Sequence, residues 1–501
     1  MKREGLLGTG VFVAASAVLL ARFLIPRPIA MSNNGDGFRV LCGAGINWDG
    51  GPEAFIHLTY PASPGEPCKP TYLLSQSWLA WFARLLGDGT LSLVMLGVLS
   101  SVIAAAAIAL LVLGLPYGLR TRLVVAAALL LVVGDSAFFG YFASILGEGT
   151  AFLGLLLMAG GLLLIARPGR WSYAGMAVTL AGGVLGVNAK VQTLTILPLL
   201  ALAVLLVRPG GRRRWLPGLL VIGALTAVTL YAQQSVEPAK EPDGTLAQRP
   251  GDDSREINMF NSIFRNIVDG EHDTQADLAE LGLPASFAQY AGNGWWGAHP
   301  ATMDPLYPRY RAQISRHNVV AYFTHHPGRA IEVFDQAAGD LLTARPDYLG
   351  SFDASAGFAP HEQEYRMPVV SWLTGLLAPL GLFVLIPAWL LIAVRALWQR
   401  RTPLGVVLAF LLAVAGSQFV AAAIGDGIEG IKHQAVALFA TLLALLLAGL
   451  PQFRGSESSS RTGSGLRRQG VQDGGNISSA NTSSPADSTT KSIPVERGTM
   501  R

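Results

Sequence analysis

Long apolar runs alternate with short polar loops along most of the chain. A helix needs about 20 apolar residues to cross a hydrocarbon core roughly 30 Å thick. Ten runs predict such helices: Leu6–Ile25, Leu91–Leu113, Leu123–Gly134, Thr150–Ala166, Tyr173–Val187, Thr193–Val207, Leu216–Ala232, Val369–Val394, Leu404–Ala423 and Ala435–Leu450. The pattern therefore predicts an all-α polytopic membrane protein.

Two of these runs differ from an ordinary membrane-spanning helix. The first also fits a cleaved signal peptide, but it is long for such a peptide and no clear cleavage site of small residues follows, so we expect an uncleaved helix. The run Leu123–Gly134 is too short to cross alone. We expect the stretch from Asp135 to Glu148 to finish the crossing and turn back, lining a cavity.

The positions of arginine and lysine predict how the chain is oriented in the membrane, and the threaded spans divide it into parts. Their clusters fall in alternate loops when ten spans are threaded, and such loops face the cytoplasm, so both termini are expected there, in the plasma membrane. The expected parts are a membrane module at 1–232 with an outer loop at 26–90, a mainly helical extracytoplasmic segment at 233–367, membrane helices at 368–450 and a tail at 451–501. The tail is rich in Ser, Gly and Thr, which favours a disordered cytoplasmic segment.

The composition indicates the environment in which the chain folds and excludes some classes of ligand. With 51% hydrophobic and 14% charged residues, the chain does not fit a single water-soluble core. Its arginines are scattered and form no basic face, which excludes nucleic acid as a partner. Cys42 and Cys68 both lie in the first outer loop, where they can pair or stay free thiols. His299, His325 and His326 do not have metal-ligand spacing, so neither a metal nor another cofactor is expected.

Charged residues gather at the expected outer ends of the spans. Asp36 lies beside Arg39 in the glycine-flanked stretch 33–40. Lys190 and Lys432 lie outside against the positive-inside rule, near helix N-termini that disfavour cations, so an anion should compensate. Salt bridges would join Lys190 to Asp135 or Glu148, and Lys432 to Asp426 or Glu429. A bound phosphate, with His433, Gln192 or Arg39 donating hydrogen bonds, is the other reading, and both can hold.

Other polar and aromatic positions add candidates. Glu148 heads a returning helix, whose dipole favours an anion, whereas Asp135 ends its helix, where an anion is disfavoured. Trp295 and Trp296 lie between two glycines and, with Tyr141, suit stacking on a sugar. The tryptophan pair also fits a loop core or a membrane-interface anchor.

Four short motifs carry a family resemblance: Asn33–Val40, Tyr141–Glu148, Ala189–Gln192 and Asp426–His433. Together they resemble bacterial multi-spanning hexose transferases of cell-surface glycan synthesis, the WsfD-like group, and more broadly the GT-C class of glycosyltransferases. The likeness covers residues 1–450, more weakly in the soluble segment. It implies an extracytoplasmic active site, a polyprenyl-phosphate sugar as donor and an essential acid in the first outer loop. Asp36 matches that acid, and Asp49 matches it less well. Ala143 stands where the pattern favours Asn, which puts any role of that side chain in doubt.

The residue types suit this chemistry. Sugar transfer needs a carboxylate to take the acceptor's proton, for which we expect Asp36, and positive charge or donors for the departing phosphate. The expected phosphate ligands are Arg39, Lys190, Gln192, Lys432 and His433, with Asp135, Glu148, Asp426 and Glu429 as supporting acids. The expected partners are membrane lipids, the lipid-phosphate sugar as co-substrate, and a glycan or lipid-linked acceptor.

Three alternatives stay open. Asp36 also fits an ordinary turn residue. A transporter or lipid flippase would place ionisable residues near the bilayer midplane and show an internal repeat. A non-catalytic assembly or scaffold protein is the third reading.

Overall fold

The computed structural model of the chain describes residues 2–48, 51–62, 73–87, 89–207, 215–233 and 254–451, all within the first of two units, Met1–Phe453 and Arg454–Arg501. Helices dominate it, and β1 and β2 form a small antiparallel pair with Thr59 opposite Ser92. In chain order the elements are α1 (Lys2–Leu24), α2 (Gly37–Gly43), β1 (Thr59–Tyr60), α3 (Ser75–Leu86), β2 (Leu91–Ser92), α4 (Leu93–Gly114), α5 (Leu119–Val133), η1 (Phe139–Ala143), α6 (Glu148–Ile165), α7 (Arg170–Val187), η2 (Gln192–Thr195), α8 (Ile196–Leu206), α9 (Trp215–Gln233), α10 (Ser254–Asn266), α11 (Thr274–Glu280), η3 (Ala285–Tyr290), η4 (Ala301–Met303), α12 (Tyr307–Tyr310), η5 (Arg311–Gln313), α13 (Arg316–His325), α14 (Pro327–Thr343), η6 (Ala354–Ala356), α15 (Val369–Leu377), η7 (Ala378–Leu380), α16 (Leu382–Trp398), α17 (Pro403–Gly425) and α18 (Gly430–Ala448).

The all-α polytopic prediction is confirmed. Among the described residues, six helices are long and apolar enough to cross a membrane, namely α1, α4, α6, α9, α17 and α18, and the pair α15 and α16 makes a seventh if it counts as one broken span. The expected spans Leu123–Gly134, Tyr173–Val187 and Thr193–Val207 fall on α5, α7 and α8, which do not meet the same test of length and composition.

The expected span Val369–Val394 is not one straight helix, because the chain bends there by 115° between η7 and α16. Pro379 removes a backbone donor, and Gly381 adopts a φ of 45°, which favours glycine. The carboxylate of Asp335 then accepts a hydrogen bond from the Leu382 N–H at 2.9 Å, at the start of α16. Hydropathy is continuous across this break, so the run reads as one helix in the sequence.

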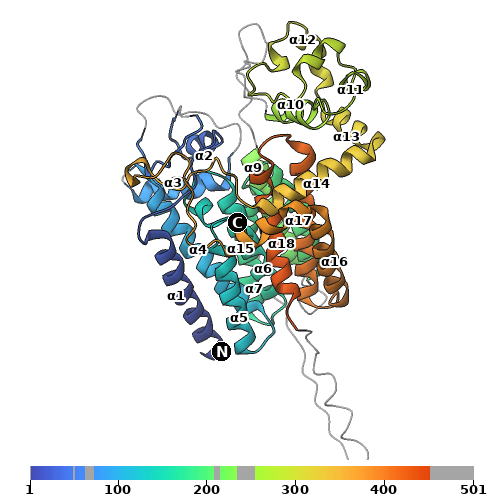
Figure 1. Cartoon of the computed structure of the whole chain (residues 1–501). Helices are drawn as coiled ribbons and strands as arrows, with labels where there is room; N and C mark the ends of the chain where they lie inside the picture. The colour runs from blue at the N-terminus through green and yellow to red at the C-terminus, as the bar shows by residue number, and fades with distance from the viewer. Residues whose placement is uncertain are drawn as a thin grey trace, which may run out of the picture. The chain divides into compact units, whose positions relative to one another are not determined.

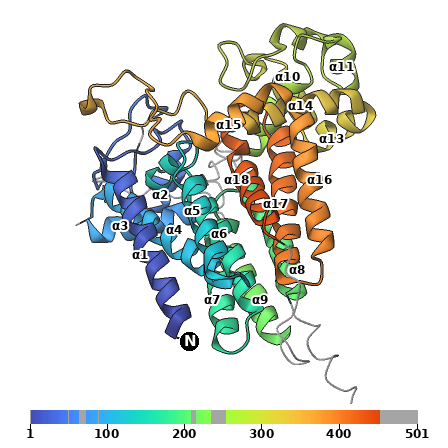
Figure 2. The ribbon, with the colours of Figure 1, turned by 60° about the horizontal axis from the view of Figure 1, so that its bottom comes forward.

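Helix α6 is buried along its whole length, with α4, α7, α17 and α18 packed against it. Figures 1 and 2 show α4, α6 and α7 side by side. The contact with α7 is close because a Cβ at Gly154 would lie 2.4 Å from the Gly186 Cα, and small residues let membrane helices approach this closely. This packing fixes the first residue of α6, Glu148, in the interior.

Helices α10 to α13 form a second core around Phe260, Phe264 and Phe287. Both ribbon views show them gathered beyond the ends of α17 and α18. Two α10 side chains fasten this segment to α17: Ser262 donates to the Ile424 carbonyl at 3.0 Å, and Asn266 donates to the Ala423 carbonyl at 3.3 Å. The domain boundaries at 232, 367 and 450 stay predictions.

Cys42, in α2, is buried and disulfide-bonded, so the free-thiol alternative is wrong for this residue. Cys68 lies outside the described residues, as does Asp49.

Candidate functional site

A tight turn between α1 and α2 positions Asp36. The Asn33 side-chain carbonyl accepts from the N–H groups of Gly35 and Gly37 at 3.0 and 2.9 Å. Gly35 has a φ of 107°, which favours glycine, and a Cβ at Gly37 would collide with the Ile145 side chain. The turn itself therefore requires glycine at position 35, and the packing against Ile145 requires it at position 37.

The Asp36 carboxylate is held between two cations. Its Oδ2 lies 2.5 Å from Lys432 Nζ, and its Oδ1 lies 2.7 Å from an Arg39 guanidinium nitrogen. Burial alone would raise the pKa of Asp36, but the charges of Lys432 and Arg39 outweigh it and hold that pKa well below its ordinary value. Asp36 is thus ionised at neutral pH.

Lys432 lies in the first turn of α18 with its side chain fully buried. Its Nζ lies 2.5 Å from both Asp36 and Glu429, so two carboxylates offset the unfavourable helix dipole. The predicted salt bridge with Glu429 is confirmed, whereas the bridge with Asp36 was not foreseen. Lys432 lies behind these acids and does not line the cavity described below, so in this arrangement it neutralises acids and does not face a ligand.

Glu429 precedes α18 with a φ of 56°, a left-handed conformation that costs a residue with a side chain about 1–2 kcal/mol. The Asn34 side-chain amide donates to both of its carboxylate oxygens, at 2.7 and 2.8 Å. Asn34 is a site residue that sequence reasoning missed. It joins the Asp36 turn to the turn between α17 and α18.

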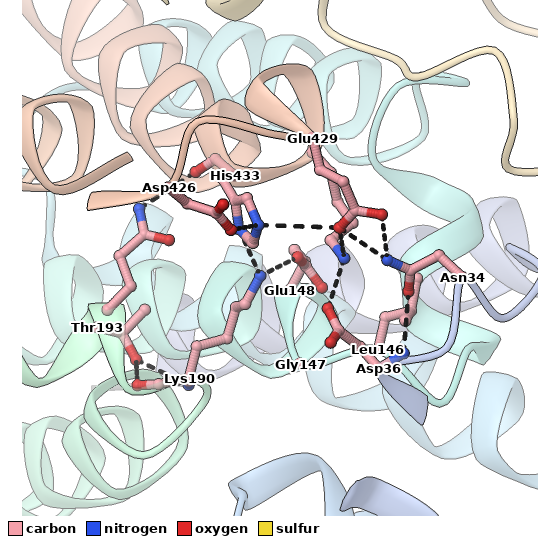
Figure 3. Close-up of polar contacts among 12 residues, drawn as sticks. Asn34, Asp36, Leu146, Gly147, Glu148, Lys190, Thr193, Asp426, Glu429 and His433 are labelled. Carbon is pink, nitrogen blue, oxygen red and sulfur yellow. Dashed lines mark hydrogen bonds and ion pairs between the residues drawn. The ribbon is translucent and has the colours of Figure 1, made fainter. Parts of the chain in front are cut away.

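A second chain of contacts begins at Lys190. Its Nζ lies 2.6 Å from Glu148 Oε1 and 3.1 Å from His433 Nδ1. The predicted salt bridge between Lys190 and Glu148 is thus confirmed. His433 Nε2 in turn lies 3.0 Å from Asp426 Oδ2 (Figure 3). An ammonium group only donates, so Nδ1 is the acceptor when Lys190 bonds to it, and Nε2–H can then donate to Asp426. His433 thus links Lys190 to Asp426.

These eight side chains form what we call the charged cluster: Asp36, Arg39, Glu148, Lys190, Asp426, Glu429, Lys432 and His433. Each comes from the end of a helix or from the loop beside it. Figure 3 shows the side chains of Asp36, Glu148, Lys190, Asp426, Glu429 and His433 converging. The residues that were expected from separate sequence motifs are thus brought together.

A cavity of about 2000 Å³ opens beside the charged cluster. All of its members except Lys432 line it, together with Gln192, and Glu256, Trp296 and Arg311 line the side that belongs to the segment α10 to α13. Glu256 and Arg311 are further residues that sequence reasoning missed. Among the described residues, no group of His, Cys, Asp and Glu side chains is arranged as a metal site.

Gln192 and Asp135 have structural partners. The Gln192 amide nitrogen donates to the Gln418 and His433 carbonyls at 3.0 and 3.2 Å, which ties η2 to α17 and α18. Asp135 is buried away from the cavity and accepts from the N–H groups of Val370 and Ser371 at 2.6 and 3.2 Å. It caps α15, whose N-terminus supplies the favourable dipole that its own helix lacks.

The three candidate stacking residues differ in exposure. Tyr141 is fully buried with its ring edge-on to Phe152, and Trp295 is partly buried and packs against Phe260 in the core formed by α10 to α13. Neither lines the cavity. Trp296 is 67% exposed and does line it.

A family model described as the YfdI N-terminal transmembrane domain matches residues 4–451. No curated protein and no solved structure matches the chain significantly.

Proposed function

The chain belongs to the family of the YfdI N-terminal transmembrane domain, and we propose that it is a membrane glycosyltransferase of GT-C type. The family supports a membrane glycosyltransferase-like protein in general and does not single out the WsfD-like group. We propose that the enzyme moves a sugar from a polyprenyl-phosphate donor to a glycan or lipid-linked acceptor. The active site would face the extracytoplasmic side, with both termini in the cytoplasm.

The observation that carries this proposal is the convergence of the charged cluster on one large cavity. Asp36, Lys190 and His433 are far apart in the sequence, yet all three line it. A carboxylate, an ammonium group and an imidazole around one space are what proton removal and phosphate stabilisation require.

Asp36 is the proposed base. The acceptor oxygen attacks the anomeric carbon and forms a new C–O bond, while the bond from that carbon to the phosphate oxygen breaks and its electron pair leaves with polyprenyl phosphate. The acceptor's hydroxyl proton passes to Asp36. Because its pKa is held low, Asp36 takes this proton only once the attacking oxygen has become strongly acidic, late in the step.

Arg39 and Lys190 are the proposed phosphate ligands, since both line the cavity. Arg39 now donates to Asp36, so a phosphate that draws Arg39 away would remove one of the charges that lower the Asp36 pKa. Donor binding would then raise the pKa of Asp36 and make it a stronger base. Lys432 stays behind Asp36 as a counter-ion, and His433 positions Lys190.

The position of the charges favours this reading over a transporter. Glu148 is the first residue of α6, and Glu429 and Lys432 lie at the start of α18. A transport pathway would instead use ionisable groups deep within the spans. Charges at helix ends suit a reaction at the membrane surface.

The test compares Asp36→Asn with wild type for transfer from radiolabelled polyprenyl-phosphate sugars in membranes, at matched protein levels. We expect a fall of at least about a hundredfold, the usual contribution of a general base. Asp347→Asn is the matched control, because Asp347 is exposed and outside the cavity. Unchanged transfer by Asp36→Asn would remove the base from the mechanism. Movement of labelled lipid across vesicles without any transfer would favour the transporter.

A further inference from the structure

The cavity is larger than one sugar phosphate requires. Its volume of about 2000 Å³ exceeds the roughly 300–1,000 Å³ of pockets that hold drug-sized ligands. The charged cluster lines one part of it. Another part has a different chemistry and comes from the segment α10 to α13.

Trp296 is the aromatic residue that α10 to α13 and their loops contribute to the cavity lining. It is 67% exposed, whereas its neighbour Trp295 is packed against Phe260. The Gly297 N–H donates to the Gly294 carbonyl at 2.9 Å, and this turn presents the second tryptophan to the cavity. An indole face left open in a cavity offers a flat apolar surface to a ligand.

Glu256 and Arg311 provide polar groups in the same part of the cavity lining. Arg311 Nε donates to Glu256 Oε1 at 2.7 Å, and a second guanidinium nitrogen contacts Oε2, so the pair is bidentate. The Tyr307 hydroxyl also donates to Glu256, at 2.8 Å. Such planar, fixed donors and acceptors suit the recognition of neighbouring hydroxyl groups.

Asn261 couples this surface to the charged cluster. Its side-chain carbonyl accepts from the Trp295 N–H at 2.7 Å, and its amide nitrogen lies 3.5 Å from Asp426. A Cβ at Gly294 would also lie 3.5 Å from the Ile428 side chain, in the turn between α17 and α18. The tryptophan turn is therefore held against the turn that carries Asp426 and Glu429.

We propose that Trp296 and the Glu256–Arg311 pair form a saccharide subsite that binds the sugar acceptor. The apolar face of a pyranose ring would lie on the indole, and its hydroxyls would bond to the ion pair. The assignment of the bound sugar as the acceptor rests on the proposed function, whereas saccharide binding at this surface does not.

The test measures binding of the methyl glycosides of glucose, galactose, mannose and N-acetylglucosamine by saturation-transfer NMR, with the full chain in lipid nanodiscs. Wild type should bind at least one glycoside, and Trp296→Ala should weaken that binding roughly fivefold. Trp296→Tyr should restore most of it, because an aromatic face remains. Met303→Ala is the control, since Met303 is 72% exposed in the same segment but does not line the cavity.

The proposal is overturned if wild type binds none of these glycosides, or if Trp296→Ala binds as well as wild type. Equal losses in Trp296→Ala and Met303→Ala would overturn it too, since they would report a general change of the segment. Donor consumption is measured separately with the Asp36 variant. Trp296-dependent binding without any donor consumption would leave the subsite standing and reject the glycosyltransferase.

Discussion

Removing the charge of Lys432 should separate its role as a counter-ion from a role in ligand binding. The Asp36 and Glu429 oxygens each lie 2.5 Å from Lys432 Nζ, so they are at most about 5 Å apart. Two like charges at that distance repel by about 3 kcal/mol at an effective dielectric constant near 20. Lys432→Met keeps the length of the side chain and leaves this repulsion uncompensated.

The expected result is a loss of about 3–5 kcal/mol of stability at neutral pH, which is usual when one partner of a buried ion pair is removed. In wild type the Asp36 pKa is lowered in the folded state, so the stabilisation is fully present above the ordinary carboxyl range and is lost only as the pH falls through the lowered pKa. This pair therefore gives wild type a flat profile between pH 5 and pH 8.

In Lys432→Met the pKa of Asp36 should rise above its unfolded value, so the folded state binds the extra proton and stability should fall as the pH rises. The assay is thermal unfolding of the purified protein in detergent from pH 5 to pH 8. Lys432→Met/Glu429→Gln removes the repulsion and should recover much of the loss. A variant as stable as wild type, or one equally destabilised at both ends of the range, would refute this account of Lys432.

Three further predictions test other parts of the structure. Arg39→Gln removes a charge that lowers the Asp36 pKa, so the acid limb of the pH profile of sugar transfer should move to higher pH; an unmoved limb would contradict the coupling. Gly154→Val should lower the thermal stability by about 1–3 kcal/mol or more, because its Cβ would lie 2.4 Å from the Gly186 Cα, whereas Gly416→Val, with nothing within 4 Å, should cost much less; equal losses would refute the close packing of α6 and α7. Asp135→Asn should lower stability by about 1–2 kcal/mol through the weakened cap on α15, with transfer per folded molecule retained; a large loss of transfer would instead place Asp135 in the chemistry.

The sequence predicts the surroundings of a residue where they depend on its own helix end or turn. Lys190 and Glu148 each lie near a helix start, where the dipole opposes a cation and favours an anion, and this made a bridge between them predictable. The turn around Asp36 was similarly readable from its glycines. The all-α class followed from the hydropathy pattern in the same way.

Partners from distant segments could not be placed in this way. Asp135 was grouped with the site because the start of α15, which supplies its hydrogen bonds, lies 235 residues further on. The bridge from Lys432 to Asp36 spans 396 positions and depends on how α2 and α18 meet. The break before α16 did leave a signal, Pro379 followed by Gly381, which hydropathy alone does not register.

Besides His433, the charged cluster holds four carboxylates but three basic side chains, those of Arg39, Lys190 and Lys432, so it is short of positive charge before a substrate enters. An anionic lipid would deepen that deficit. A phosphate that binds Arg39 or Lys190 would have to compete with Asp36 or Glu148 for the same cation, so loading of an anionic substrate would require these ion pairs to rearrange.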